Sequence, residues 1–286
     1  MSTFDTPEPI SATITLARGD VRISAGDRAS TTVEVRPSDA SEPDDRKLAE
    51  LTRVEYADGR LLVKAPKLQS WRLRSAGGSI DVTVELPAGS HVHGTAAWAD
   101  FRCDGALGDC RLKTGLGSIL VDRADTPDLK TGTGDITLDH ATGHAEVAAG
   151  SGDVRVRALD GTAVIKSSNG DTWVAAGGDL RVSAANGGIS VDVANASLVA
   201  KSSNGDVRLG VAVRGTVVLE TRLGDVEVGI RDGTAAWLDV SAGAGKVHNA
   251  LEAAQAPESS ADTVEVRGRT SIGDIVVGRP REAVAG

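Results

Sequence analysis

A glycine recurs through the middle of this 286-residue chain at spacings of 17 to 21 residues, and a similar phrase surrounds it each time. The phrase reads Leu-Lys-Thr-Gly-Thr-Gly-Asp-Ile-Thr-Leu at residues 129–138 and Ala-Lys-Ser-Ser-Asn-Gly-Asp-Val-Arg-Leu at residues 200–209. The anchoring glycines are Gly117, Gly134, Gly152, Gly170, Gly187, Gly205, Gly224 and Gly245. Self-similarity at such a period predicts a repeat architecture, in which each unit buries its apolar face against its neighbours.

Apolar residues occupy four fixed positions around each anchoring glycine, at offsets −7, −5, +2 and +4. Around Gly205 these positions are held by Leu198, Ala200, Val207 and Leu209. Thr172 is the polar exception among the inner repeats. A spacing of two residues is strand periodicity, because alternate side chains of a strand point to one face. Each repeat therefore carries two short strands.

The two apolar pairs lie nine residues apart, so each repeat divides into two halves made of a strand and a turn. Stacked halves would pair strand on matching strand at about 4.8 Å and enclose a thin core. We therefore predict an all-β fold, a parallel β-solenoid with about 18 residues and two strands per coil. An antiparallel sandwich ranks second, since it does not require residues 18 apart to match. The low count of large rings, with two Phe, one Tyr and four Trp, suits a thin core.

The sequence predicts three segments within one elongated domain. Residues 1–89 form an N-terminal β-rich cap with a short helix near residues 42–53, residues 90–250 form the solenoid, and residues 251–286 form a strand pair and a disordered tail that begins at Arg279.

Within the cap, a hairpin is expected around Ala57-Asp58-Gly59, and the four apolar offsets recur around Gly19 and Gly78. Ser41 would lie near the start of the helix, and Pro43 early in its first turn. Near the other end, a loop rich in Pro, Ser and Ala at residues 253–262 is followed by expected strands at 263–266 and 272–277. The residues around Gly19 are Ala12, Ile14, Val21 and Ile23, and those around Gly78 are Trp71, Leu73, Ile80 and Val82.

The charge balance argues against nucleic acid and anionic membranes as partners. The formal net charge is −9, from 40 acidic and 31 basic residues, and the bases form no block. The chain also has no long apolar run and no signal-like start, so we expect no membrane span and a cytoplasmic location. Cys103 and Cys110 fall at inward offsets and are expected to be buried thiols, because facing sheets stand too far apart for a disulfide.

An acidic residue follows many of the glycines, and stacking would bring these residues into one row, here called the Asp ladder. Neighbouring carboxylates repel, so a turn hydrogen bond, a lysine across the turn or a cation must offset the cost. Calcium-binding β-rolls place a residue between Gly and Asp, which this chain does not, so calcium is not expected. The ladder is Asp20, Asp109, Asp135, Asp153, Asp171, Asp206, Asp225 and Asp274, and the lysines at offset −4 are Lys113, Lys130, Lys166 and Lys201.

No residue is nominated as catalytic, cofactor-binding or metal-binding. His91 and His93 should share one face, but a catalytic zinc site takes three protein ligands, and neither His140 nor His144 can be assigned as a third. The coils do not divide into sixes as in hexapeptide acyltransferases, no groove of acids and bases typical of pectin-lyase-like helices stands out, and the repeats lack a Gly-x-Ser-x-Gly nucleophile elbow.

The repeated Lys-Ser-Ser-Asn-Gly-Asp-Val phrase, with Val-Glu-Leu-Pro-Ala-Gly leading into the array at residues 84–89, resembles a bacterial family of unknown function. It is the β-strand-repeat family labelled "putative adhesin". The resemblance covers residues 10 to 278 and implies a non-catalytic surface for binding. It supplies no catalytic or ligand residues.

The sequence thus favours a non-enzymatic binding or scaffolding module that contacts a protein partner or its own copy. Outward rows such as Arg155, Trp173 and Arg208 would supply the contacts, and Trp237 also falls at an outward offset. The alternative is a carbohydrate-binding or carbohydrate-active β-helix protein. It predicts a cluster of acids on one side, or a pocket walled by the insertion at residues 40–70.

Overall fold

The computed structural model describes residues 1–66, 78–251 and 262–280. These residues form two compact units, Met1–Thr142 and Gly143–Gly286. Strands fill most of both units, and the single helix of the described residues lies in the first. The all-β, parallel β-solenoid fold predicted from the glycine spacing is confirmed, including the short helix near the N-terminus.

In the first unit, parallel coils grow from one long strand, β2. It pairs in parallel with β5, β6 and β7, while β7 pairs with β8, and β8 with β9. β1, β3 and β4 break the pattern, because β1–β3, β3–β6 and β4–β5 are antiparallel. The strands are β1 Ser2–Asp5, β2 Ser11–Gly26, β3 Ser30–Pro37, β4 Arg53–Ala57, β5 Arg60–Lys64, β6 Ile80–Pro87, β7 His91–Leu116, β8 Ile119–Thr133 and β9 Ile136–Ala141.

The helix α1, Pro43–Leu51, and the β4–β5 hairpin form the cap of this unit. Glu42 is the N-cap residue, one position after the expected Ser41, and Pro43 holds the first helical position, where its missing N–H costs nothing. The hairpin turns at Asp58 and Gly59, which have φ of 49° and 71°, as a two-residue primed turn requires. Both elements therefore lie where the sequence predicts them.

The offsets around Gly19 are confirmed, since Ala12, Ile14, Val21 and Ile23 are all buried. Around Gly78, the structure describes only two of the four residues that were predicted to point inward. Ile80 and Val82 are buried on β6, whereas Trp71 and Leu73 lie outside the described residues.

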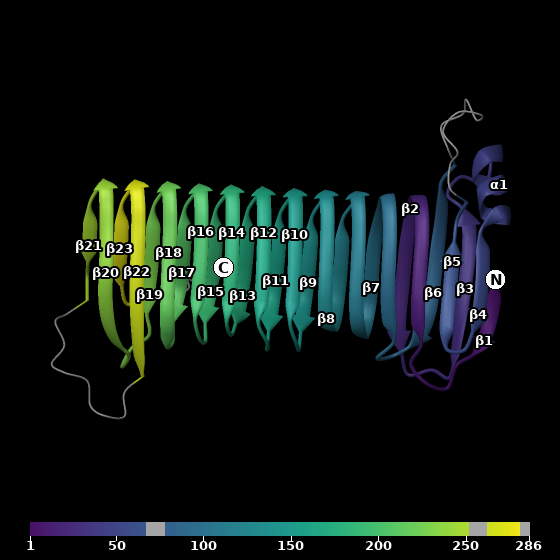
Figure 1. The fold of residues 1–286 in the computed structure, drawn as a ribbon, viewed down its shortest axis with the longest axis horizontal. Coiled ribbons are helices and arrows are strands. Elements are labelled where there is room, and N and C mark those ends of the chain that lie inside the picture. Colours follow the sequence, from purple (N-terminus) through teal and green to yellow (C-terminus); the bar gives the residue numbers. More distant parts are fainter. Residues whose placement is uncertain (67–77, 252–261, 281–286) are drawn as a thin grey trace. The chain divides into compact units, whose positions relative to one another are not determined.

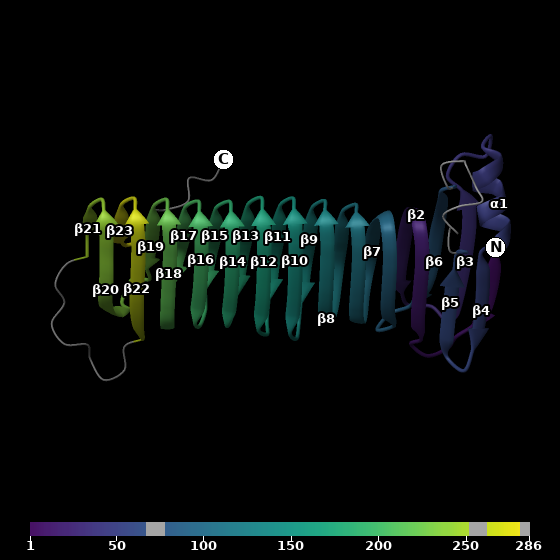
Figure 2. The same cartoon turned by 45° about the horizontal axis from the view of Figure 1, so that its top comes forward.

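In the second unit, strands of two sheets alternate along the chain, and each pairs in parallel with the equivalent strand one coil away. Figure 1 and Figure 2 show this alternation in the ribbon. The strands are β10 Ala145–Ser151, β11 Val154–Leu159, β12 Ala163–Asn169, β13 Thr172–Gly177, β14 Leu180–Asn186, β15 Ile189–Ala194, β16 Leu198–Asn204, β17 Val207–Ala212, β18 Gly215–Leu223, β19 Val226–Ile230, β20 Ala235–Ala244, β21 Val247–Asn249, β22 Thr263–Ile272 and β23 Ile275–Gly278.

The anchoring glycines are required because the turn needs both a positive φ and a close backbone contact. Gly205 has a φ of +141°, and a Cβ atom built on it would lie 2.2 Å from the carbonyl oxygen of Gly187, one coil away. An L residue would meet both torsional strain and a steric clash at this position. The period of the sequence is thus the period at which one turn stacks directly on the next.

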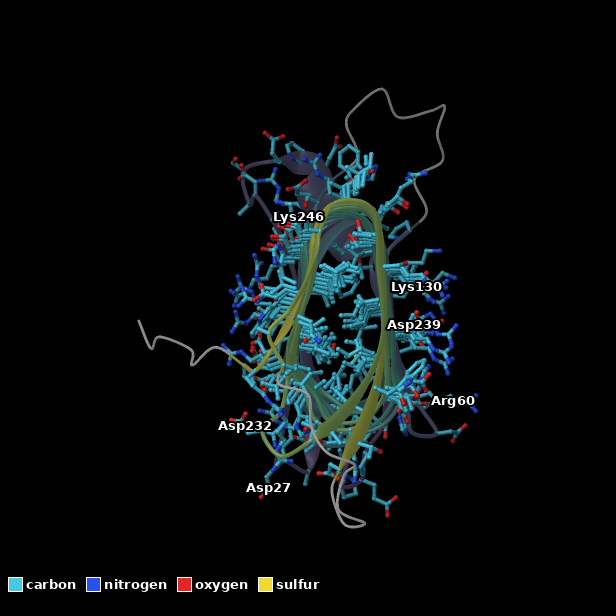
Figure 3. The ribbon with its side chains drawn as sticks, turned by 90° about the vertical axis from the view of Figure 1, so that its left-hand side faces the viewer. Asp27, Arg60, Lys130, Asp232, Asp239 and Lys246 are labelled. Atoms are coloured by element: carbon cyan, nitrogen blue, oxygen red, sulfur yellow. The ribbon has the colours of Figure 1, made fainter. Side chains whose placement is uncertain are left out.

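The core contains more inward rows than the four offsets predicted. The residues at offset −3 are also buried, and many of them are Ser or Thr whose hydroxyls donate to the anchoring glycine of a neighbouring coil. Thr221 donates to the oxygen of Gly205 at 2.8 Å, and Thr270 to that of Gly224 at 2.9 Å. Small residues such as Ala194 and Ala212 fill another buried row at offset +7. Figure 3 shows the inward side chains between the sheets.

The last strands of the chain do not form the last coil of the second unit. β22 pairs with both β18 and β20, and β23 pairs with both β19 and β21. The expected C-terminal strand pair therefore exists, but it inserts between two coils that precede it in sequence (Figure 1). β20 and β21, here called the terminal coil, each have one described strand partner.

Arg279 corrects the expectation of a tail that is disordered from that residue onward. Its guanidinium donates to the carbonyl oxygen of Arg231 at 2.7 Å and lies 3.6 Å from a carboxylate oxygen of Asp232. The rest of the expected tail, residues 281–286, and nearly all of the expected loop at 253–262 lie outside the described residues.

Candidate functional site

The Asp ladder is a structural device in which carboxylates accept backbone hydrogen bonds from the next coil. The N–H of Asp171 donates to Asp153 Oδ1 at 3.0 Å, and that of Asp225 donates to Asp206 Oδ1 at 2.8 Å. Hydrogen bonds to the ionised form stabilise a carboxylate. Of the three offsets to repulsion considered from the sequence, the structure shows the turn hydrogen bond, and Asp153 also lies 2.9 Å from Arg155.

Two asparagine amides continue this edge of the second unit. Asn186 Nδ2 donates to Asn169 Oδ1 at 3.0 Å, and Asn204 Nδ2 donates to Asn186 Oδ1 at 2.8 Å. The lysines near the turn form ion pairs on the outer face of the sheet. Lys201 lies 2.7 Å from Glu220, and Lys130 lies 2.8 Å from Asp128. The polar side chains at this edge thus hold one another in place.

The histidines take separate positions. His91 and His93 are exposed on one face of β7, as predicted, and His91 Nδ1 accepts the backbone N–H of Asp109 at 2.9 Å. His144 Nδ1 lies 2.7 Å from Thr162 Oγ1. Across residues 1–66, 78–251 and 262–280, no group of three or more His, Cys, Asp or Glu side chains has the geometry to hold a metal ion.

Cys103 and Cys110 are buried free thiols, as predicted. The hydrogen bond between the two side chains, together with burial, raises the pKa of the Cys103 thiol well above its ordinary value. The nucleophilic form of cysteine is the thiolate, so this environment makes Cys103 unreactive.

A hollow of about 540 Å³ in the first unit surrounds an exposed tryptophan. Trp98 is 52% exposed, and the guanidinium carbon of Arg18 lies 5.4 Å from its ring centroid. Asp20 is in register with Asp81 on β6 and with Asp100 on β7, which brings three carboxylates side by side. Burial and then the like charges of its two neighbours raise the pKa of Asp20. Ser38 and Ser79 complete the lining.

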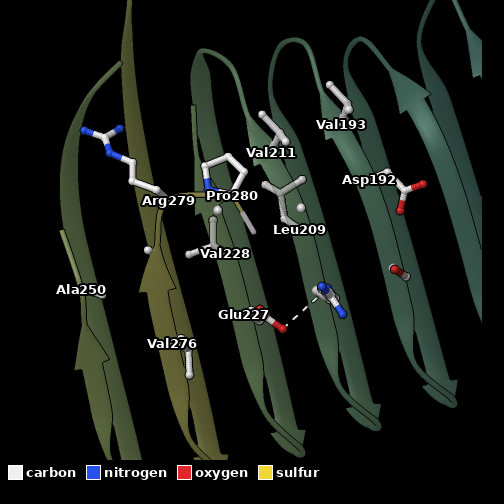
Figure 4. Close-up of a pocket in the computed structure, with 15 residues that line it drawn as sticks. Asp192, Val193, Leu209, Val211, Glu227, Val228, Ala250, Val276, Arg279 and Pro280 are labelled. Atoms are coloured by element: carbon white, nitrogen blue, oxygen red, sulfur yellow. Dashed lines mark ion pairs between the residues drawn. The ribbon is translucent and has the colours of Figure 1, made fainter. Parts of the chain in front are cut away.

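A groove of about 820 Å³ runs over the outer face of β15, β17, β19 and β23 in the second unit (Figure 4). Its floor is low because Gly210, Gly229 and Gly278 follow one another in adjacent coils. Arg208 and Glu227 on its lining lie 3.6 Å apart. Asp192 accepts the indole N–H of Trp173 at 3.2 Å and Arg279 donates to the carbonyl oxygen of Arg231, so the charged side chains of the lining already have partners.

The terminal coil exposes apolar side chains that the preceding coils bury. Leu238 and Val240 are half-buried, whereas Leu219 at the offset of Val240, two coils inward, is 0% exposed. Trp237 is 59% exposed, and a hollow of about 890 Å³ lies beside it over β18, β20 and β22. Ile272 and Val247 are 57% and 43% exposed on the same coils.

Sequence reasoning found some of these features and missed others. Trp237 was predicted to point outward and does so, while Trp173, also outward, is half-buried, with its indole N–H 3.2 Å from Asp192. The Trp98 hollow and the exposure of the terminal coil were missed. No distinct sequence signal marks the latter, because the Asp ladder is also interrupted in inner coils, at Ser118 and Gly188.

Several solved structures are similar to the chain over most of its length, at low sequence identity. Among solved structures, the chain is 12% identical to a "putative adhesin" from Parabacteroides distasonis, with a TM-score of 0.39, covering 97% of this chain and 95% of that one. A "putative adhesin" from Bacteroides fragilis is 13% identical, with a TM-score of 0.32, and the match covers 96% of this chain and 95% of that one. A "putative lipid binding protein" from Parabacteroides distasonis is 12% identical, with a TM-score of 0.32, and the match covers 98% of this chain and 94% of that one. No curated protein matches the chain.

Within residues 1–66, 78–251 and 262–280, no helix has the length and apolar character needed to span a membrane. The model of the Toastrack DUF4097 family matches residues 11–275, which is nearly the whole chain. With its stacked parallel coils and this match, the chain belongs to the Toastrack DUF4097 family, a family of unknown function.

Proposed function

We propose that this chain is a non-enzymatic binding module whose main contact surface is the terminal coil of the second unit. The observation that carries the proposal is the coincidence of two features there. Trp237 and Val247 are exposed, and β20 and β21 each have a single strand partner among the described residues. An edge strand with exposed apolar side chains is a template for pairing with another chain.

The inner coils offer a weaker surface. Their outward rows carry many charged side chains, which form pairs such as Arg155–Asp153 at 2.9 Å and Lys201–Glu220 at 2.7 Å. Exposed pairs of this kind contribute little free energy, and a partner must displace or desolvate them. β20 has one charged side chain, Asp239, which lies 3.6 Å from Arg269, so fewer charges need to be desolvated there, and this favours the terminal coil as the contact surface.

Site-specific photo-crosslinking tests this proposal. A benzophenone-bearing residue at position 237 should capture a polypeptide, while the same residue at position 181, exposed on β14 in the middle of the unit, should capture far less. Equal yields at the two positions, or no product at either, would contradict a contact surface at the terminal coil.

A second candidate function is carbohydrate binding in the first unit, as the alternative from the sequence anticipates. The Trp98 hollow favours it, because an exposed ring next to Asp20, Asp81 and Asp100 combines an apolar platform with hydrogen-bond acceptors. Titration with a panel of neutral and amino-containing oligosaccharides should then change the tryptophan emission of the native protein. The change should vanish in Trp98→Ala, and an unchanged native spectrum across the panel would remove this candidate.

The predicted absence of catalysis, the cytoplasmic location and the absence of calcium binding stay proposals. For calcium, the ladder geometry supplies an argument, since the Oδ1 atoms of Asp153, Asp206 and Asp225 already accept backbone N–H groups. A native-state ligand raises the melting temperature by mass action, so added calcium should leave it unchanged.

A further inference from the structure

Along one side of β20, the backbone groups have no strand partner among the described residues. The N–H of Ala235 donates to the carbonyl oxygen of Asp262 at 3.0 Å, so Ala235 directs its backbone groups toward β22. Successive residues of a strand direct their N–H and C=O groups to opposite sides. The same parity directs Trp237, Asp239 and Ser241 toward β22, and Leu238, Val240 and Ala242 toward the open edge.

Core packing restricts how this edge can pair with a second copy. Two identical strands related by a two-fold axis run antiparallel. Residues directly opposite each other then share a face, so the inward row must lie opposite inward residues. This condition holds only when the two-fold axis passes through a residue of β20 rather than between two residues. Only then do the inward residues Leu238, Val240 and Ala242 lie opposite inward residues of the copy.

Charge and size select one of these arrangements. An axis through Asp239 would place that carboxylate directly opposite its own copy, which is unfavourable. An axis through Val240 places Asp239 opposite Ser241, and Trp237 opposite Gly243, whose missing side chain leaves room for the ring. Leu238 then lies opposite Ala242, which alternates large and small residues across the joined core.

We propose that two copies of this chain pair through β20, antiparallel and centred on Val240, so that the two cores become continuous. This rests on the proposed function, because it names the partner of the terminal coil. Leu238, Val240 and Ala242 direct their free N–H and C=O groups toward the copy, which gives about six backbone hydrogen bonds in this register. Trp237 and the half-buried Leu238 lose exposed surface at the same time.

A cysteine at the centre of the pairing tests the register. Opposite residues of a hydrogen-bonded antiparallel pair have Cα atoms about 5.5 Å apart, which is within the range of a disulfide. Val240→Cys should therefore form a covalent dimer under mild oxidation, while Val182→Cys, at the same offset in an inner coil, should not. The native thiols at Cys103 and Cys110 are buried and should not compete.

Light scattering on the full chain supplies a second, independent measurement. The native protein should show about twice its chain mass of 29.3 kDa at high concentration and dissociate on dilution. Ser241 is exposed, and Ser241→Asp should weaken association at least tenfold because it faces Asp239 of the copy, whereas Ser241→Lys should strengthen it.

A monomer at every concentration, or equal crosslinking of the two cysteine variants, would overturn self-pairing. Identical masses for Ser241→Asp and Ser241→Lys would overturn the Val240 register. The proposed function fails by a different result, since it requires only that position 237 crosslinks to some polypeptide. A position-237 product that contains only a different polypeptide would keep the binding function and overturn self-pairing.

Discussion

The capped end of the first unit and the terminal coil of the second unit solve the problem of an exposed sheet edge differently. In the cap, α1 and the antiparallel strands β1, β3 and β4 lie beside the parallel coils, and the short β4 carries charges such as the Arg53–Glu55 ion pair. Phe4 and Tyr56 pack with ring centroids 5.2 Å apart. Charges and short antiparallel strands at an edge discourage pairing with other chains.

Among the described residues, no helix or antiparallel strand lies beside the terminal coil. β20 is ten residues long, and Asp239 is its single charged side chain. In Figure 3, Asp239 lies on the outer side of the sheet and Lys246 near the turn. The comparison indicates that the cap of the first unit is built to stop strand addition and the terminal coil of the second unit to permit it, which is why the binding surface is assigned to β20.

The largest expected difference in stability is between two glycine-to-alanine substitutions, one at a glycine that stacks on the turn of another coil and one at a glycine that does not. Gly205→Ala should destabilise the protein by about 3 kcal/mol or more, because its Cβ would meet the carbonyl oxygen of Gly187. Gly233, with a φ of +77° and no atom within 4 Å of its Cβ position, should lose only about 1 kcal/mol on the same change. Urea denaturation measures both, and equal losses would contradict the stacking explanation.

The second expected difference in stability is between leucine-to-alanine substitutions in the closed core of an inner coil and in the half-exposed core of the terminal coil. Leu219→Ala should cost about 3 kcal/mol, since Leu219 is fully buried between coils. Leu238→Ala should cost about 1 kcal/mol in dilute protein, because Leu238 is only half-buried. If the two substitutions cost the same in the monomer, the terminal coil is closed in solution, and the comparison fails.

A third substitution is expected to stabilise the closed core. Thr172 is 1% exposed, and its hydroxyl has no hydrogen-bond partner at a position that other coils fill with Val or Ile. Thr172→Val should therefore raise the free energy of unfolding by about 1 kcal/mol. A lower melting temperature for this variant would show that the hydroxyl is satisfied in solution.

The smallest expected effect on stability at neutral pH comes from Cys103, and this effect increases as the pH rises above the ordinary thiol pKa. Its pKa is raised in the folded protein, so the folded state holds the thiol proton at a pH where the unfolded chain loses it. Stability should thus be unaffected below about pH 8, and should fall as pH rises above the ordinary thiol pKa of about 8.5. Cys103→Ala should have a flatter profile between pH 8 and 10, measured by thermal unfolding, and parallel profiles would contradict the assignment.

The sequence predicted the inner coils well because their physical requirements repeat. An anchoring glycine with a positive φ and alternating apolar pairs recur in every coil, so each instance supports the others. The buried Ser and Thr row at offset −3 was missed because polar residues at regular spacing resemble a solvated face. Thr221 shows the difference, since its hydroxyl is satisfied by the Gly205 carbonyl of another coil, a contact that a single repeat does not contain.

The ends were harder to predict because their structure depends on order in space rather than in sequence. The strand pair at residues 263–278 has an ordinary repeat pattern, and nothing local indicates that it inserts before Ala235–Asn249. The exposure of Val247, at an offset that inner coils bury, follows from that insertion. The Trp98 hollow likewise needs β6 and β7 on either side of β2, and these pairings join residues about 60 and 80 apart, such as Asp20 with Asp81 and Asp20 with Asp100.

Amide hydrogen exchange on the full chain tests most directly whether the terminal coil is the contact surface. The amides of Leu238 and Val240 point to the open edge, so they should exchange quickly in dilute protein and slow markedly as concentration rises. The amides of Ile165 and Val182, in the middle of the unit, should be protected equally at all concentrations. If the amides of residues 238 and 240 exchange quickly at every protein concentration, self-pairing is contradicted. If they exchange slowly even in dilute protein, the open edge is contradicted.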